Sequence, residues 1–202
     1  MKKAIIVDID GTICDSRARM SESIREILGK YIPPEKVQYT VEANVSNVTK
    51  EEKRRIWKVF LSSRYISYDK PIPYSQELMK YFSSRGYSIF YLSSRPISMF
   101  DETMQWLKEY GYPEGTLILR RGFEKDITFK EKEVHQITIY YQVDYGLGDT
   151  PNDIIVYNKF EICSIAITTF YSKQKLLESG ARIIVSSWKE ILDNPSILES
   201  NC

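Results

Sequence analysis

The sequence is poor in the residues that mark several large classes of protein. Its 202 residues include a single histidine, His135, which excludes chemistry that needs two imidazoles. They include only three cysteines, Cys14, Cys163 and Cys202, an odd set without the spacing of a metal site. We therefore expect three free thiols in a protein of the reducing cytoplasm.

The sequence also has almost no net charge and no long hydrophobic run. The 28 basic and 27 acidic residues give a net charge of +1, so the total charge offers no electrostatic case for a nucleic-acid or membrane partner. A local basic patch is compatible with this neutral total. No apolar run is long enough to span a bilayer. Because the sequence opens on a strand pattern followed at once by an acidic motif, we expect no signal peptide. The oligomeric state is left open.

Short hydrophobic runs alternate with helical patterns along most of the chain. This alternation is typical of a parallel sheet covered by helices, so the predicted fold class is α/β. Strands are predicted at residues 4–7, 88–92, 117–119, 141–147, 162–168 and 183–185. Helices are predicted to start near Ser75, Ser98, Lys130, Pro151 and Ser187.

One segment, residues 16–70, breaks this alternation. Ile24 and Leu28 have helical spacing, and Thr49 with Glu52 forms a capping box before another helix. We predict that this segment is a small helical insertion. The predicted units are an α/β core at 1–15 and 71–202 and a helical cap at 16–70.

Two carboxylates, Asp8 and Asp10, stand at the end of the first predicted strand. Residues i and i+2 of a strand point the same way, so a turn at Gly11 lets both side chains converge beyond the strand. Open α/β sheets bind ligands at this edge, where one carboxylate can attack a substrate while the other moves a proton. An ordinary Asp-Gly turn explains the same residues.

The fourth predicted strand is followed by Gly-Asp-Thr-Pro-Asn-Asp at 148–153. Thr150 is a predicted helix cap, and acidic residues in a first helical turn are favoured by the helix dipole alone. Capping does not explain four carboxylates at the ends of two strands. They would repel one another, and an oxygen-ligated Mg²⁺ ion would relieve that repulsion.

The second predicted strand ends at Ser93, the first residue of a Ser-Ser-Arg-Pro sequence. Its hydroxyl and the following backbone amides could bind a phosphate oxygen, although an ordinary turn explains the sequence equally well.

Taken in order, these motifs resemble those of the haloacid dehalogenase (HAD) superfamily of phosphohydrolases. The resemblance runs from about Lys3 to Leu192 and consists of Asp8-Ile9-Asp10-Gly11-Thr12, Ser93, a lysine, and residues 148–153. It implies a Rossmann-like parallel sheet flanked by helices, with a small α-helical cap inserted after the first motif.

The lysine of this set has three candidates, Lys125, Lys130 and Lys132. We choose Lys130, because Arg120, Asp126 and Lys130 resemble a stretch in the phosphatase part of polynucleotide kinase-phosphatases. Lys132 is the alternative.

The resemblance implies a role for each motif. The first aspartate forms an aspartyl-phosphate, the second moves protons, and the serine and lysine hold the phosphoryl oxygens. The predicted catalytic residues are Asp8, Asp10, Ser93 and Lys130. The predicted phosphate-binding residues are Gly11 and Thr12, through their backbone amides, with Ser94 and Arg95. The predicted Mg²⁺ ligands are Asp8, Asp10 (through its backbone carbonyl), Asp149 and Asp153.

The implied activity is Mg²⁺-dependent hydrolysis of a small phosphorylated metabolite, with nucleotides and sugar phosphates both open. A cap over the site favours a small substrate over a polymer end. The alternatives are a nucleotidase or polynucleotide 3′-phosphatase, a phosphomutase, and a non-catalytic phosphate-binding protein. Cap residues that could face substrate are Arg17, Arg19, Arg54, Arg55 and Trp57, although a solvated helix face or the core of the cap explains most of them.

Overall fold

A sheet of six parallel strands lies at the centre of the computed structural model, which describes residues 1–38, 40–200 and 202. The strands are β1 (Lys2–Val7), β4 (Ser88–Pro96), β5 (Thr116–Arg120), β6 (Tyr141–Gly148), β7 (Cys163–Ile167) and β8 (Ile183–Val185). Their order, β5-β4-β1-β6-β7-β8, confirms the predicted Rossmann-like α/β fold. Since β4 and β6 lie on opposite sides of β1, the topological switch point is at the carboxyl end of β1, where such sheets bind ligands.

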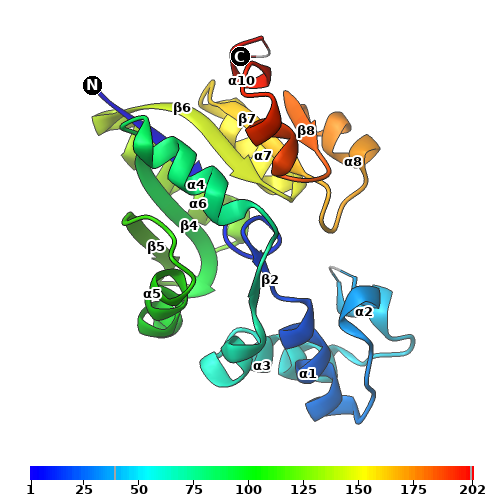
Figure 1. The fold of residues 1–202 in the computed structure, drawn as a ribbon. Coiled ribbons are helices and arrows are strands. Elements are labelled where there is room, and N and C mark those ends of the chain that lie inside the picture. The colour runs from blue at the N-terminus through cyan, green and yellow to red at the C-terminus, as the bar shows by residue number, and fades with distance from the viewer. Residues whose placement is uncertain (39, 201) are drawn as a thin grey trace.

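Helices cover both faces of this sheet (Figure 1). The side chains of β1 alternate, so that Ile5 and Val7 face one helical layer while Ala4 and Ile6 face the other. The first layer holds α4 (Ser75–Ser84), η3 (Ile97–Met99), α5 (Phe100–Glu109), α9 (Lys189–Asp193) and α10 (Ile197–Ser200). The second layer holds α6 (Asp126–Tyr140), α7 (Pro151–Lys159) and α8 (Lys173–Glu178).

The segment between β1 and β4 forms a helical insertion with a hydrophobic cluster of its own. It contains α1 (Arg17–Leu28), η1 (Pro34–Lys36), α2 (Val41–Asn44), α3 (Lys50–Phe60) and η2 (Ser63–Tyr68). Ile24 of α1 and Ile56 of α3 are fully buried in this cluster. The predicted capping box is present, because the Thr49 side chain accepts from the Glu52 amide and Glu52 accepts from Thr49.

The insertion joins the core through a two-stranded neck. β2 (Cys14–Asp15) and β3 (Lys70–Pro71) pair antiparallel, and the Ile72 amide donates to the Ile13 carbonyl at 2.9 Å. Both crossings of the chain therefore run side by side. In Figure 1 the insertion, drawn in blue and cyan, lies beyond one edge of the sheet next to this neck.

The predicted helices differ from the structure in two respects. The helix predicted from about Lys130 starts earlier, at Asp126. The predicted cap of the last helix, α9, is confirmed, because the Ser187 hydroxyl accepts from the Lys189 amide at 3.3 Å and the Glu190 carboxylate accepts from the Ser187 amide at 3.0 Å. The short helices α8 and α10 were not predicted, since each is shorter than the window over which helical periodicity is visible.

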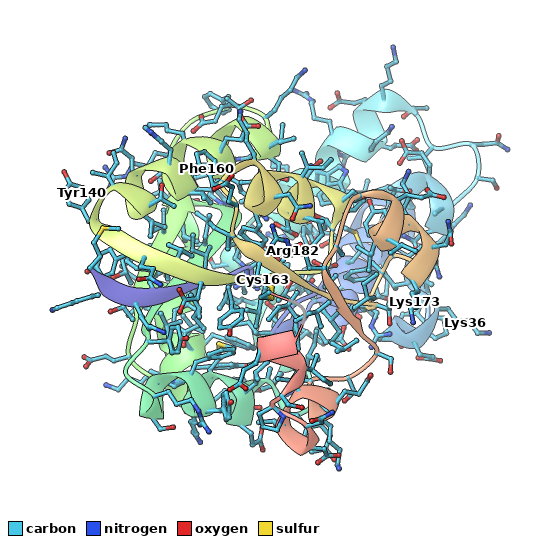
Figure 2. The ribbon with its side chains drawn as sticks, turned by 90° about the horizontal axis from the view of Figure 1, so that it is seen from above. Lys36, Tyr140, Phe160, Cys163, Lys173 and Arg182 are labelled. Atoms are coloured by element: carbon cyan, nitrogen blue, oxygen red, sulfur yellow. A yellow bond between two sulfur atoms is a disulfide. The ribbon has the colours of Figure 1, made fainter. Side chains whose placement is uncertain are left out.

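The expectation of three free thiols is also wrong. Cys163 of β7 is joined to Cys202 by a disulfide with Cα atoms 5.6 Å apart, and the free thiol is that of the buried Cys14. Figure 2 shows Cys163 on its strand within the core. The pairing ties the end of the chain to the sheet. Among the described residues no helix has the length and apolar character needed to cross a membrane.

Candidate active site

Three carboxylates meet at the carboxyl edge of the sheet. Asp8 directly follows β1, Asp149 directly follows β6, and Asp153 lies in the first turn of α7. Each is buried, and each offers one oxygen within 4.8 Å of those of the other two. Burial, together with the neighbouring charge of Asp153, raises the pKa of Asp8 to about 7 in spite of Lys130. Burial and the charges of Asp8 and Asp153 raise the pKa of Asp149 well above its ordinary value.

Two glycines allow these carboxylates to approach so closely. Gly11 has a φ of +86°, and a Cβ there would lie 2.2 Å from Oδ2 of Asp149. A Cβ on Gly148 would lie 2.4 Å from the Cβ of Asp153. Any larger residue at either position would displace a carboxylate of the cluster.

Capping and site formation both use Asp153. Its Oδ2 accepts from the Thr150 amide at 3.1 Å and from the Thr150 hydroxyl at 2.7 Å, which is the capping box of α7. Its Oδ1 accepts from Nζ of Lys130 at 2.6 Å. Helix capping and a role in the carboxylate site, both left open by the sequence, therefore involve different oxygens of the Asp153 side chain.

The structure brings Lys130 rather than Lys132 to the carboxylates. Nζ of Lys130 lies 2.7 Å from Oδ1 of Asp8 as well as 2.6 Å from Oδ1 of Asp153. Burial alone would lower the pKa of Lys130, but Asp153 and Asp8 outweigh it and hold the pKa well above its ordinary value. The side chain of Lys132 is 72% exposed and lies beside Glu133.

The donor set fits a divalent cation. Oδ2 of Asp149 is buried and has no hydrogen-bond partner in the described part of the chain, whereas Oδ1 accepts from the Thr12 hydroxyl at 3.3 Å. Three carboxylates face one ammonium group, which leaves the cluster negative if all are ionised. A buried oxygen without a donor in an all-carboxylate cluster suits Mg²⁺, which prefers oxygen ligands.

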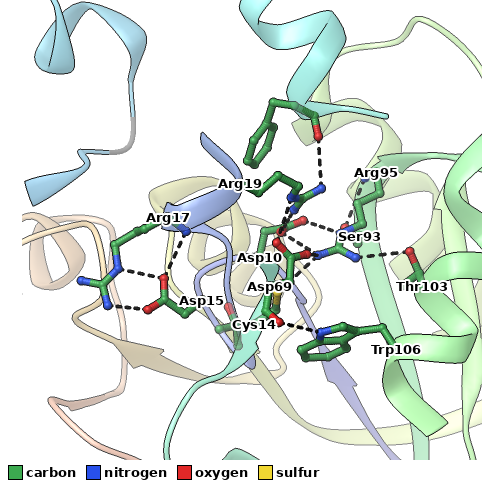
Figure 3. Close-up of polar contacts among 12 residues, drawn as sticks. Asp10, Cys14, Asp15, Arg17, Arg19, Asp69, Ser93, Arg95, Thr103 and Trp106 are labelled. Carbon is green, nitrogen blue, oxygen red and sulfur yellow. Dashed lines mark hydrogen bonds and ion pairs between the residues drawn. The ribbon is translucent and has the colours of Figure 1, made fainter. Parts of the chain in front are cut away.

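Asp10 belongs to a second charged cluster, formed with Arg19, Asp69 and Arg95 (Figure 3). Arg95 donates to both oxygens of Asp10 at 2.8 Å and to Asp69 at 2.8 Å. Arg19, which comes from α1 of the insertion, pairs with Asp10 and lies 3.0 Å from Asp69. Burial would raise the pKa of Asp10, but the two guanidinium groups hold it below its ordinary range. The cluster thus joins the insertion to the core through buried charge.

Several predicted phosphate contacts have other partners in the structure. The Gly11 amide donates to the Cys14 carbonyl at 2.8 Å, and the Thr12 amide donates to the Ile9 carbonyl at 3.2 Å. Both amides are therefore hydrogen-bonded within the turn that follows β1. The Arg95 guanidinium is engaged by Asp10 and Asp69. These placements do not favour phosphate binding by these three groups.

The two serines at the end of β4 line the cleft beside Asp8. The hydroxyl of Ser93 accepts from the Arg95 amide at 3.2 Å, and that of Ser94 donates to Asp126. Ser93 is 2% exposed, and its role in binding a phosphoryl oxygen stays a prediction.

The cleft lies between the core and the insertion and holds about 850 Å³ of empty space that opens to solvent. Of the five predicted cap residues, Trp57 lines it, while Arg19 enters the buried cluster. Arg17 pairs with Asp15, Arg54 pairs with Glu51, and Arg55 is exposed. Sequence reasoning missed Asp69, Gln38 and Phe170. They are single residues outside any motif, and no periodic or spacing signal distinguishes them.

Comparison with known protein families identifies the family of this chain. A family model described as the LNS2 domain of PITM 1-3 matches residues 58–171, more than half of the chain. The chain belongs to the LNS2 family. The matched range of this LNS2 chain includes Ser93, Lys130, Asp149 and Asp153 and starts after Asp8 and Asp10.

Individual proteins similar to this LNS2 chain share less than a third of its sequence. A Bacillus cereus protein provisionally named a nucleotidase is 28% identical over 189 residues, which cover 92% of this chain and 94% of that protein. A haloacid dehalogenase-like hydrolase from Streptococcus pneumoniae aligns with a TM-score of 0.71 at 18% identity, over 96% of this chain and 97% of that one. A protein from Clostridium acetobutylicum described as a phosphatase by prediction aligns with a TM-score of 0.72 at 16% identity, over 98% of this chain and 99% of that one. These alignments confirm the HAD-like fold.

Proposed function

We propose that this chain is a Mg²⁺-dependent phosphomonoester hydrolase that acts through an aspartyl-phosphate on Asp8. One observation carries the proposal. The buried Asp8 carboxylate accepts from Nζ of Lys130 and meets Asp149 and Asp153 in a cluster in which one buried oxygen of Asp149 has no donor among the described residues. A nucleophile, a fixed cation and an all-oxygen metal site at a sheet switch point are the parts that phosphoryl transfer needs.

Lys130 and Thr12 orient the nucleophile. Lys130 binds Oδ1 of Asp8, and the Thr12 hydroxyl lies 3.3 Å from both Oδ2 of Asp8 and Oδ1 of Asp149, which share its one proton. Lys130 also offsets negative charge as a phosphoryl group approaches, and the Ser93 hydroxyl lines the same cleft. Asp8, Asp149 and Asp153 would hold Mg²⁺, which supplies charge that keeps these carboxylates ionised and reduces their repulsion of a phosphate.

Asp10 suits the second half of the reaction. Its pairing with Arg19 and Arg95 keeps the carboxylate ionised, which is the state that a general base needs to take a proton from water. Protonation of the leaving group requires the opposite state, so Asp10 must first loosen from one arginine. The insertion carries Arg19 and is therefore the element whose movement would release Asp10.

A nucleotide is the second candidate within this activity. Two relatives, at 28% and 24% identity, are provisionally named nucleotidases. For a polynucleotide end the supporting feature is the placement of Arg120, Asp126 and Lys130 together on the wall of the cleft. The insertion above the cleft favours a small substrate over a polymer.

Phosphate release from a panel of phosphomonoesters, with Mg²⁺ and with EDTA, tests the proposal. The panel includes mononucleotides, sugar phosphates, phosphoglycolate and a 3′-phosphorylated oligonucleotide. We expect metal-dependent release that Asp8→Asn abolishes. Asp15→Asn is the matched control, because Asp15 pairs with Arg17 and is not among the residues that line the cleft. Folded protein that releases no phosphate from any ester would favour a phosphate-binding protein instead.

A further inference from the structure

The cleft is built asymmetrically. Its core side carries the charged groups around Asp8 and Lys130, whereas its insertion side carries no charged group among the described residues and is mostly apolar. The insertion contributes the apolar Met20, Val37, Trp57, Phe60 and Leu61 and the polar Ser16 and Gln38. The same cleft therefore has a charged side and a mostly apolar side.

Trp57 is the largest side chain that the insertion contributes to the cleft. It lies on α3 and is partly exposed, and its ring meets Phe60 edge to face at 5.3 Å. The ring of Phe60 is itself covered by the guanidinium of Arg19 at 4.2 Å. Both rings line the cleft, and Trp57 is the less buried of the two. Phe170, from the loop after β7, lines the cleft as well.

Arg120 supplies an independent observation. It ends β5 and lines the same cleft as Asp126, whose negative charge it stabilises. Its Nη1 donates to the Glu124 carbonyl at 3.1 Å, but its Nε is buried and has no acceptor among the described residues. A buried donor without a partner indicates an acceptor on a ligand.

We propose that the cleft takes a nucleoside monophosphate, with its planar base against Trp57 and an oxygen acceptor on Arg120. This inference rests on the proposed function, since the phosphate is placed at Asp8 and Lys130. It decides between the two substrate classes that the sequence left open. A sugar phosphate would bury hydroxyls against the mostly apolar side of the cleft, and each hydroxyl without a partner costs about one order of magnitude in affinity.

Equilibrium binding to the Asp8→Asn variant tests the inference apart from turnover. Uridine 5′-monophosphate and ribose 5-phosphate form a matched pair, because they differ in whether C1 of the ribose carries a base or a hydroxyl. We expect the nucleotide to bind at least about tenfold more tightly. Trp57→Ala should remove that gap by weakening nucleotide binding about 5- to 100-fold, the range of base stacking on an aromatic ring. Binding of ribose 5-phosphate should not change.

Three further variants define the result. Trp57→Phe should retain most of the preference, which separates ring stacking from a damaged insertion. Arg54→Met is the control on the same helix, since Arg54 is 78% exposed and pairs with Glu51 outside the cleft. Arg120→Met should weaken the nucleotide more than ribose 5-phosphate.

Equal affinity for the two ligands, or a gap that survives Trp57→Ala in a folded protein, would overturn the inference. So would decyl phosphate binding as tightly as the nucleotide, because the mostly apolar side of the cleft would then select a flexible chain. Failure of the proposed function would be seen in a different measurement. If the proposed function alone is wrong, the wild-type protein with Mg²⁺ would bind the nucleotide with the expected preference but release no phosphate from it.

Discussion

Replacement of Arg19 by methionine removes one charge from the buried cluster that joins the insertion to the core. The Arg19 side chain is 0% exposed. It pairs with Asp10, lies 3.0 Å from Asp69, and donates to the Phe60 carbonyl at 3.1 Å. Methionine keeps much of the length and apolar volume of the side chain, so the change mainly removes the guanidinium.

The expected loss of stability follows from the buried Asp69 carboxylate that Arg19→Met leaves with one fewer partner. Asp69 is also 0% exposed, and among the described residues Arg95 would be its one remaining ionic partner. Breaking a buried ion pair by removing one partner costs about 3–5 kcal/mol in the free energy of unfolding. For a chain of this length that corresponds to a fall of roughly 10 °C in the melting temperature.

Arg17→Met is the matched control. Arg17 lies two residues away at the start of the same helix and pairs with Asp15, but the two side chains are 32% and 26% exposed. We expect the control to cost less than about 1 kcal/mol. Figure 3 shows the two arginines pointing to their separate partners.

Urea unfolding followed by circular dichroism measures both variants. Asp69→Asn should be destabilised to a similar degree, and the double variant with Arg19→Met should lose less than the sum of the two single losses, because the partners interact. If Arg19→Met and Arg17→Met unfold at the same urea concentration, the cluster does not hold the insertion in place and the reasoning is wrong.

Three further predictions concern the carboxylate cluster. Lys130→Met should lower kcat/KM by at least about a hundredfold, as expected for a lost charge of about 3 kcal/mol, while Lys132→Met should leave kinetics unchanged; the reverse pattern would reassign the lysine. Gly11→Ala should weaken Mg²⁺ binding measured by calorimetry at least about tenfold, because the new Cβ would sit 2.2 Å from Asp149 Oδ2; unchanged binding would remove Asp149 from the site. In EDTA, the free energy of unfolding should fall between about pH 5 and pH 7, by on the order of 1 kcal/mol per pH unit. The pKa of Asp8 is about 7 in the folded protein against 3.8 for the ordinary group, so the folded state holds a proton that the unfolded chain has lost, and rising pH disfavours it. Asp8→Asn should reduce this slope in chemical unfolding without removing it, because the raised pKa of Asp149 contributes a slope of the same sign; an unchanged slope would contradict the assignment to Asp8.

The parts of this fold that the sequence predicted are those with local causes. β1 is a run of apolar residues that ends at acidic ones, and it was predicted from that run. The capping boxes at Thr49 and Thr150 depend on residues three apart, so they are visible in the sequence and present in the structure. Asp8 and Asp149 directly follow β1 and β6, which are neighbouring parallel strands. The positions of the strand ends therefore suffice to predict that the two side chains meet.

The remaining features depend on contacts between distant segments. Nothing near Asp69 in the sequence indicates that two arginines, 50 and 26 residues away, will surround it. The same contacts occupy Arg95, whose position after Ser93 had suggested a phosphate ligand. The disulfide between Cys163 and Cys202 spans 39 residues and has no spacing signal. Tertiary packing, rather than any local pattern, decides these positions.

The helical insertion is intermediate between these cases. Its existence between β1 and β4 followed from the break in periodicity. Its contribution to the cleft did not, because Trp57 has the same sequence pattern whether it fills the core of the insertion or faces a ligand. The structure shows it packed on Phe60 and lining the cleft.

The most direct test of the account is to look for phosphate on Asp8. Wild-type protein with Mg²⁺ is mixed with a hydrolysed phosphomonoester, quenched in acid during turnover and reduced with borohydride, which converts an aspartyl-phosphate to homoserine. Mass spectrometry of the peptide that contains Asp8 should then show homoserine at that position, and none in protein quenched without substrate. Rapid turnover with an unmodified Asp8 throughout, or undiminished turnover by Asp8→Asn, would contradict covalent catalysis by this residue.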